Sequence, residues 1–171
     1  MNINRKKIIP LLSVPFLTLW DQLTKTAAQA NLKGKADYPL FPGILEFSYL
    51  ENTGAAFSSF LGKQGFLITL TSLVMIFLLI KYFRIPEGKR YLPMHVTLLL
   101  IVSGGIGNLI DRMINGYVID FIYFVPINFP KFNVADCYVT IGMILLCYLC
   151  FFYYKDEELN FLFTFKAADS R

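Results

Sequence analysis

The sequence predicts a mainly α-helical membrane protein, with four membrane-spanning helices and a small sheet on the outer side. Its 171 residues are 56% hydrophobic and only 16% charged, with a mean hydropathy of +0.53. Soluble domains are about 45–50% apolar and about one quarter charged. The apolar residues fall in four blocks and the basic residues mostly between them, as in multi-pass membrane proteins. The net charge of +4 therefore reflects topology, and we expect no nucleic-acid partner.

Four segments are long enough to cross a bilayer, whose apolar core of roughly 30 Å needs about 20 helical residues. We assign them to a single integral membrane domain covering residues 1–171. The first is apolar as far as Trp20 and then carries Asp21 and Lys25, so it spans only if this pair lies near its outer end. The predicted spans are 8–30, 65–83, 91–112 and 134–154.

The positions of lysine and arginine predict the orientation. Ten of the sixteen basic residues lie in the N-terminal segment, in the loop between the second and third spans, and in the tail 155–171. The positive-inside rule places these parts in the cytoplasm, with both termini inside and loops 31–64 and 113–133 outside. A cleaved signal peptide is disfavoured, because the Ala-Gln-Ala at 28–30 lies far beyond the apolar run and three more spans follow.

Asp21 and Lys25 are four residues apart and share one face of the first helix, where they can pair. Two interpretations stay open. The pair is an interfacial anchor, with Trp20 in the aromatic belt and Lys25 extending to the headgroups. Alternatively, the pair faces a functional site and orders its wall.

The first outer loop predicts a short sheet. Prolines and a glycine between residues 39 and 43 exclude a helix. Apolar and polar residues then alternate over 45–49, which is the pattern of a half-buried strand. Residues 51–54 predict a turn, and the small apolar run 54–61 is expected to lie on the membrane. The sheet is either a cap on the helices or a substrate platform, with the Asn52 side chain bonding an extended peptide.

The third span carries small residues and then a polar stripe. Ser103 and Gly107 allow neighbouring helices to approach closely. Asn108, Asp111 and Arg112 lie three or four residues apart and share the outer end of the helix. We expect Asp111 and Arg112 to act as scaffold, neutralising their neighbours or each other. Asn115 and Gly116 are expected to end this helix.

Asp120 and Asp136 are the candidate catalytic residues. Asp120 is the sole charge in an apolar, β-branched and aromatic segment, and Asp136 lies in the first turn of the fourth span, where Asn133 is the predicted N-cap. The helix dipole favours an ionised Asp136, while its apolar surroundings make Asp120 the harder one to ionise. Two carboxylates that meet share a proton, and such a pair can activate water against an amide.

Other chemistry has little support. Acids in membrane segments also serve as proton relays and ion sites, so the two aspartates alone leave the reaction open. A single histidine, His95, cannot build the usual histidine-rich zinc site. Three cysteines lie in the fourth span, where structural thiols are favoured and nothing demands a disulfide. We expect neither a metal nor a cofactor.

Five short motifs occur in order across most of the chain. They are Asp21–Lys25, Asn52–Phe57, Gly104–Arg112, Val118–Phe121 and Phe132–Asp136. Each alone is a weak signal, but together they are highly specific. With them the chain resembles the bacterial lipoprotein signal peptidases, the signal peptidase II family.

The resemblance implies a four-helix aspartic peptidase of the bacterial inner membrane with an outer β-cradle. Members of the family cleave the signal peptide of a prolipoprotein before a cysteine that carries diacylglycerol, and the cyclic peptide globomycin inhibits them. The implied catalytic dyad is Asp120 and Asp136. The implied partners are these signal peptides, membrane lipid and globomycin-type inhibitors, and we expect a monomer. The implied supporting residues are Asp21, Lys25, Asn52, Gly54, Asn108, Asp111, Arg112, Asn133 and Ala135.

Two features depart from the family pattern. Val139 stands where the last motif more often has isoleucine, which is a conservative change at a packing position. The tail 157–171 matches nothing in the family, and we expect an amphipathic or disordered end. The alternative function is a small proton- or ion-coupled transporter that uses the same acids as a relay, although we find no internal repeat.

Overall fold

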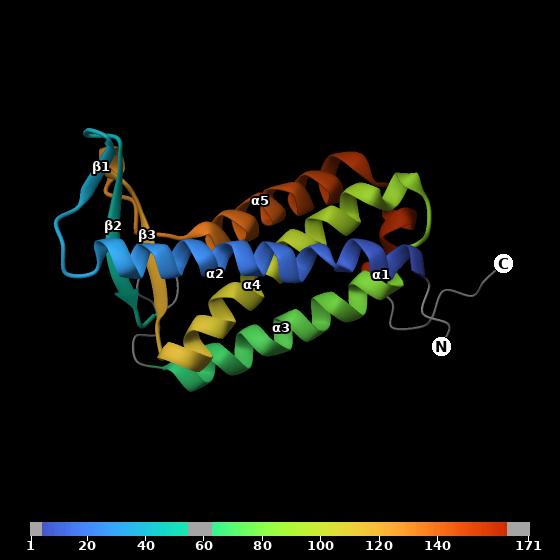
Figure 1. The fold of residues 1–171 in the computed structure, drawn as a ribbon. Coiled ribbons are helices and arrows are strands. Elements are labelled where there is room, and N and C mark those ends of the chain that lie inside the picture. Colours follow the sequence, from blue (N-terminus) through green and yellow to red (C-terminus); the bar gives the residue numbers. More distant parts are fainter. Residues whose placement is uncertain (1–4, 55–62, 164–171) are drawn as a thin grey trace.

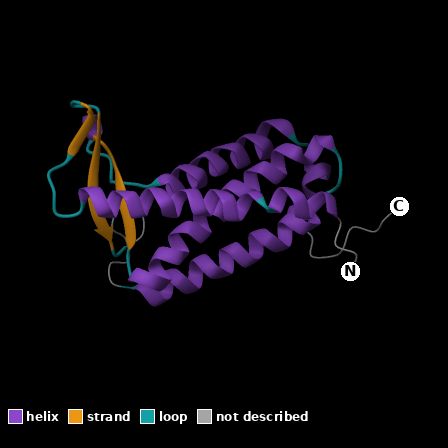
Figure 2. Cartoon of the chain, in the orientation of Figure 1, coloured by secondary structure: helices purple, strands orange, loops and turns teal. Residues whose placement is uncertain are grey.

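The computed structural model describes residues 5–54 and 63–163 and shows a bundle of long helices with a small sheet at one end (Figures 1 and 2). The helices are α1 Arg5–Leu11, α2 Ser13–Leu32, α3 Gln64–Arg84, α4 Leu92–Asn115, α5 Val134–Tyr148 and α6 Asn160–Phe163. The strands are β1 Tyr38–Phe41, β2 Leu45–Asn52 and β3 Val118–Phe124.

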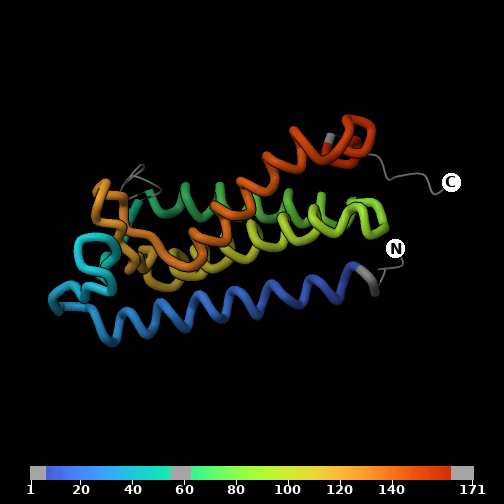
Figure 3. The backbone as a smooth tube through the Cα atoms, turned by 90° about the horizontal axis from the view of Figure 1, so that it is seen from above, coloured from blue at the N-terminus to red at the C-terminus, as the bar shows by residue number. Residues whose placement is uncertain are grey.

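Helix α4 is the centre of the bundle and contacts α2, α3 and α5 (Figure 3). Small residues let these neighbouring helices approach α4, as we predicted from Ser103 and Gly107. A Cβ on Gly107 would lie 2.5 Å from Asp21 Oδ2 of α2 and 3.2 Å from Ala135 Cβ of α5. The predicted end of α4 is confirmed, because Gly116 closes it with φ 77°, a conformation that favours glycine.

We predict that Gly104→Ala destabilises the bundle. The added Cβ would meet the backbone carbonyl oxygen of Ala135 and would lie 2.8 Å from Val139 Cγ2, so α4 and α5 must separate. Overpacking of this kind costs about 1–3 kcal/mol. Thermal unfolding in detergent should show a lower Tm. The matched control is Gly65→Ala in α3, where nothing lies within 4 Å of the added Cβ. An equal loss of Tm in both variants would contradict the close approach of α5 to α4 at Gly104.

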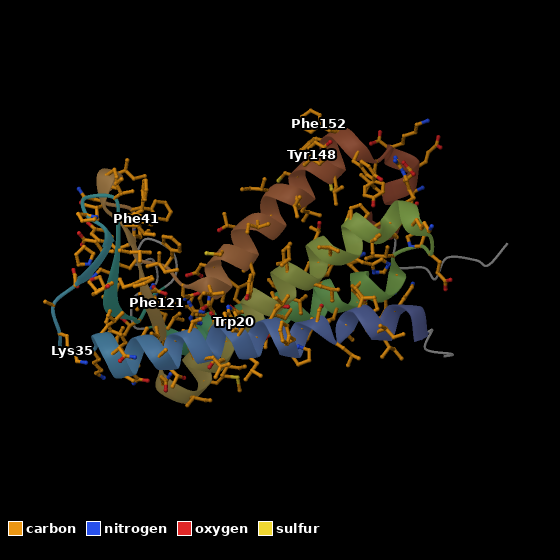
Figure 4. All side chains as sticks on the ribbon, turned by 45° about the horizontal axis from the view of Figure 1, so that its top comes forward. Trp20, Lys35, Phe41, Phe121, Tyr148 and Phe152 are labelled. Atoms are coloured by element: carbon orange, nitrogen blue, oxygen red, sulfur yellow. The ribbon has the colours of Figure 1, made fainter. Side chains whose placement is uncertain are left out.

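Within the described residues, three helical segments are long and apolar enough to cross a membrane: Gln64–Arg84, Lys89–Asn115 and Val134–Tyr153. The last includes the π-helical turn Leu149–Tyr153, which continues α5. Helix α2 does not reach the same hydropathy, because Asp21, Gln22 and Lys25 lie in its middle. The aromatic side chains of Tyr148 and Phe152 project away from the bundle at the far end of α5, 54% and 80% exposed (Figure 4).

The first predicted span, 8–30, is broken into α1 and α2 at Leu12. Pro15 explains the position of the break. Proline has no N–H for the carbonyl four residues earlier, which belongs to Leu11, and its ring crowds that carbonyl. Helix α1 accordingly ends at Leu11 and α2 begins at Ser13.

The sheet has the order β1-β2-β3 and is antiparallel throughout. It differs from the sequence prediction in two ways. The outer loop 113–133 contains β3, which the sequence analysis treated as loop only. The predicted turn 51–54 begins too early, because β2 extends to Asn52, which pairs with Val118. Both differences arise because β3 supplies the partner that extends β2, and a strand's partner is not visible in its own sequence.

The part of the tail that the structure describes is packed rather than a free end. Residues 156–159 form a 3₁₀ turn, α6 follows, and Leu159 and Phe161 are buried in the main core beside Tyr82 and Met94. Arg90 donates to both carboxylate oxygens of Glu158 at 3.0 and 3.1 Å, which fastens this turn to the start of α4. The rest of the tail, 164–171, and the predicted membrane-surface run, apart from Gly54, lie outside the described residues.

Candidate active site

Asp120 and Asp136 come together through Asn133. Asp120 lies in β3, Asp136 lies in the first turn of α5, and Asn133 directly precedes that helix. The Asn133 side chain donates to Asp120 Oδ1 at 2.7 Å, while its backbone N–H donates to Asp136 Oδ2 at 3.0 Å. A single residue therefore touches both carboxylates and fixes their relative position.

Local structure explains why Asn133 occupies this place. Phe132 folds back on β3, where its carbonyl accepts from the N–H groups of Phe121 and Ile122 at 3.0 and 2.9 Å. The next residue, Asn133, is thus held beside Asp120. The predicted N-cap is confirmed: Asn133 Oδ1 accepts from the Asp136 N–H at 2.9 Å, and Asp136 completes a capping box.

Each of the four carboxylate oxygens accepts one hydrogen bond from an N–H donor. Asn52 Nδ2 donates to Asp120 Oδ2 at 2.9 Å, and Asn108 Nδ2 donates to Asp136 Oδ1 at 2.8 Å. Asn133 supplies the other two donors. The two carboxylates are therefore held from both sides, by groups from β2, α4 and the start of α5.

Asp120 is the more enclosed of the two acids, with 2% of its surface exposed. Burial, and after it the charge of Asp136, raises the pKa of Asp120 to about 7, against the opposing effect of the Asn52 and Asn133 amides. This confirms that Asp120 is hard to ionise in its apolar strand. It also shows that the two carboxylates interact electrostatically.

Asp21, Lys25 and Asp111 form a buried ion triad beneath the acids. Lys25 Nζ lies 2.8 Å from Asp21 Oδ2 and 3.0 Å from Asp111 Oδ2, and none of the three is more than 2% exposed. Interpreting Lys25 as an interfacial anchor is therefore wrong. Its third bond goes to Asn108 Oδ1 at 2.9 Å, which connects the triad to the residue that donates to Asp136.

The triad also ties separate elements to one another. Asp21 Oδ1 accepts from the backbone N–H of Ala135 at 2.8 Å, so a carboxylate of α2 satisfies a free donor at the start of α5. Asp111 Oδ2 accepts from the backbone N–H of Ile119 at 3.2 Å, next to Asp120 in β3. The triad thus positions the backbone beside each of the two acids.

Arg112 lies on the side of the site toward the sheet. Its Nη2 donates to the Gly54 carbonyl at 3.1 Å, and its Nη1 to the Asn108 carbonyl at 3.5 Å. Of the alternatives weighed for Asp111 and Arg112, the structure shows Asp111 paired with Lys25 and Arg112 bound to backbone carbonyls. Gly54 in turn donates its N–H to Asn52 Oδ1 at 2.9 Å.

Two features of the site were missed by the sequence analysis. Asn52 was considered as a binder of substrate backbone, but in the structure its side chain joins Asp120 to Gly54. Gln22 was not singled out, although its Nε2 lies within hydrogen-bond distance of Asp21 Oδ2, Asp111 Oδ1 and the Gly107 carbonyl at 3.0–3.2 Å. A polar residue between Asp21 and Lys25 in an apolar helix was the available signal.

Comparison with known proteins agrees with this arrangement. A family model described as signal peptidase (SPase) II matches residues 14–152. Curated proteins named lipoprotein signal peptidase, from Streptococcus pyogenes serotypes M5 and M3, are 39% identical over 153 residues, which cover 90% of this chain and 97% of theirs.

Two solved structures described as bacterial membrane enzymes share the fold. One has a TM-score of 0.73 and 31% identity, covering 85% of this chain and 87% of its own. The other has a TM-score of 0.72 and 30% identity, covering 87% and 94%. The family match spans every residue of the site described above. The chain therefore belongs to the signal peptidase II family.

Proposed function

We propose that Asp120 and Asp136 are the catalytic pair with which this peptidase cleaves the signal peptide from prolipoproteins. Peptidase activity follows from membership of the lipoprotein signal peptidase family. The observation that carries the assignment of the pair is the double contact of Asn133, at 2.7 Å to Asp120 and 3.0 Å to Asp136. It holds these two carboxylates together at the point where sheet and helices meet.

The chemistry requires one proton on the pair. Asp120, whose pKa is raised to about 7, holds this proton below that pH, and Asp136 takes a proton from the attacking water. The water oxygen bonds to the scissile carbonyl carbon while Asp120 gives its proton to the carbonyl oxygen. Collapse of the tetrahedral intermediate breaks the C–N bond. The leaving nitrogen takes a proton from Asp136, and Asp120 takes back the proton of one hydroxyl of the intermediate as the product carboxyl group forms. The pair ends with a single proton, as it began.

This mechanism predicts a pH limit for cleavage. An acid with a raised pKa keeps its proton below that value and loses it above, so the rate should fall as the pH rises through about 7. The Asn52 amide lowers the pKa of Asp120, so Asn52→Ala should move the falling limb to higher pH. Initial rates measured from pH 5 to 9 give both results. The control is Asn31→Ala, which removes an exposed amide of α2 and should leave the falling limb of the pH–rate profile at its original pH.

We assign supporting roles to the remaining residues. Asn52, Asn108 and Asn133 orient the carboxylates. Asp21, Lys25 and Asp111 fix the backbone at Ala135 and Ile119, and Arg112 holds Gly54 and with it Asn52. None of these residues needs to touch the peptide for the pair to work.

The proposed topology has α2 as a fourth span, in the bacterial inner membrane. Helix α1 and the connection between α3 and α4 lie at the end opposite the sheet (Figure 1), and Lys7, Arg84 and Lys89 are there. The positive-inside rule supports a cytoplasmic position for this end and for both termini, with the sheet outside. The substrate then presents a diacylglyceryl cysteine near the outer headgroups. We further propose a monomer that binds globomycin-type inhibitors.

A reconstitution experiment tests the function. The purified chain in liposomes receives a prolipoprotein with a diacylglyceryl cysteine, and the same precursor without the lipid. We expect release of the signal peptide from the lipidated form only. Proton or ion flux through the liposomes without any cleavage would instead establish the transporter alternative.

A further inference from the structure

An apolar groove of about 340 Å³ lies on the side of the bundle away from α5. One wall comes from α1 and α2 and includes Leu12 and Pro15, the other includes Leu79 of α3, and Val102 and Ile106 of α4 form the floor. Every lining residue is apolar. The groove exists because α2 and α3 both pack against α4, with α4 between them (Figure 3). Leu12, at the break between α1 and α2, lines the groove and is 64% exposed.

Lys7 does not line the groove, but it directly precedes the lining residue Ile8 in α1 and so lies beside one end of it. It lies one turn before Leu11 on α1, and its ammonium donates to the carbonyls of Phe83 and Ile85 at 2.8 and 2.6 Å, at the C-terminal end of α3. An ammonium has three donors, and within the described residues two of them are used in these hydrogen bonds. Lys7 is partly exposed, and the exposed Glu87 is near enough to interact with it electrostatically. The Lys7 ammonium therefore joins α1 to the C-terminal end of α3 at this end of the groove.

We propose that this groove binds one acyl chain of an anionic phospholipid, with the headgroup phosphate at Lys7. Basic sites between membrane helices at the cytoplasmic side are suited to such headgroups. A signal-peptide helix fits less well, because its n-region is positively charged, as Lys7 is.

Lipid titration of the purified protein in detergent tests the site. Binding of phosphatidylglycerol and of phosphatidylcholine is measured by native mass spectrometry. We expect phosphatidylglycerol to bind more tightly than phosphatidylcholine. Lys7→Gln should weaken the binding of phosphatidylglycerol about fivefold, and Leu12→Trp should abolish this binding by filling the groove.

The controls are Lys89→Gln, which removes an exposed cation at the same end, and Leu19→Trp, which changes an exposed leucine of α2 outside the groove. Both should bind as the unaltered chain does. Lys7→Gln also loses bonds to α3, so affinity and not Tm is the measure.

A photo-crosslinking residue at position 12 identifies the occupant. Irradiation in liposomes that contain phosphatidylglycerol and a prolipoprotein should give a lipid adduct. An adduct with the signal peptide, or equal binding of both lipids unaffected by Lys7→Gln, would overturn the proposal. The inference depends on the bundle lying in a bilayer and not on the catalytic pair. Asp136→Asn should therefore bind lipid normally, so that the two proposals fail separately.

Discussion

Asp136→Asn and Asp120→Asn each lower the rate of prolipoprotein cleavage by about 10²- to 10⁴-fold, the range that a general acid or base contributes. Asparagine keeps the size of the side chain and still accepts one of the two N–H bonds that each carboxylate receives, but it cannot exchange a proton with water. The loss should therefore appear in kcat, with little change in KM. Single-turnover cleavage of a lipidated precursor is the measurement.

The controls separate chemistry from folding. Glu157→Gln changes an exposed acid of the tail and should cleave at the normal rate. Both aspartate variants should stay folded with a Tm close to that of the unaltered chain, because replacing a buried carboxylate that can ionise by a neutral amide offsets the one N–H bond that each variant loses. Normal cleavage by either aspartate variant would remove that residue from the mechanism.

Lys25→Met destabilises the protein by about 3–5 kcal/mol, because Asp21 and Asp111 are left as buried charges without their cation. For a chain of this length the loss corresponds to a Tm lower by roughly 6–20 °C. Lys33→Met is the matched control. Lys33 also pairs with a carboxylate, Glu51 at 2.6 Å, but it is 52% exposed, and such pairs contribute about 0–1 kcal/mol. Thermal unfolding of both variants in detergent gives the comparison.

A rescue variant tests the cause of this loss. Adding Asp21→Asn and Asp111→Asn to Lys25→Met leaves no unpaired buried charge, so part of the Tm should return. Cleavage should stay low, because Asn108 still lacks the lysine that holds its amide toward Asp136. If Lys25→Met costs no more than Lys33→Met, the triad does not stabilise the fold.

The sequence by itself located the three long apolar helices, marked two of their ends and singled out the two acids that we propose as catalytic. Hydropathy located α3, α4 and α5, because apolar runs of this length are a property of consecutive residues. Asn133 and Gly116 marked the start of α5 and the end of α4, since capping depends on residues within one turn. The apolar neighbours of Asp120 in the chain predicted that it would be hard to ionise, and its burial in the structure raises its pKa accordingly.

Only the tertiary structure decided which groups meet. Asp21 satisfies the N–H of Ala135, 114 residues away, and Lys25 is buried because Asp111 of another helix shares it. Strand β3 was missed for the same reason, since β2 supplies its partner. The burial of a charge depends on partners brought by other elements. Local sequence patterns do not encode these partners, although they named every acid in the site.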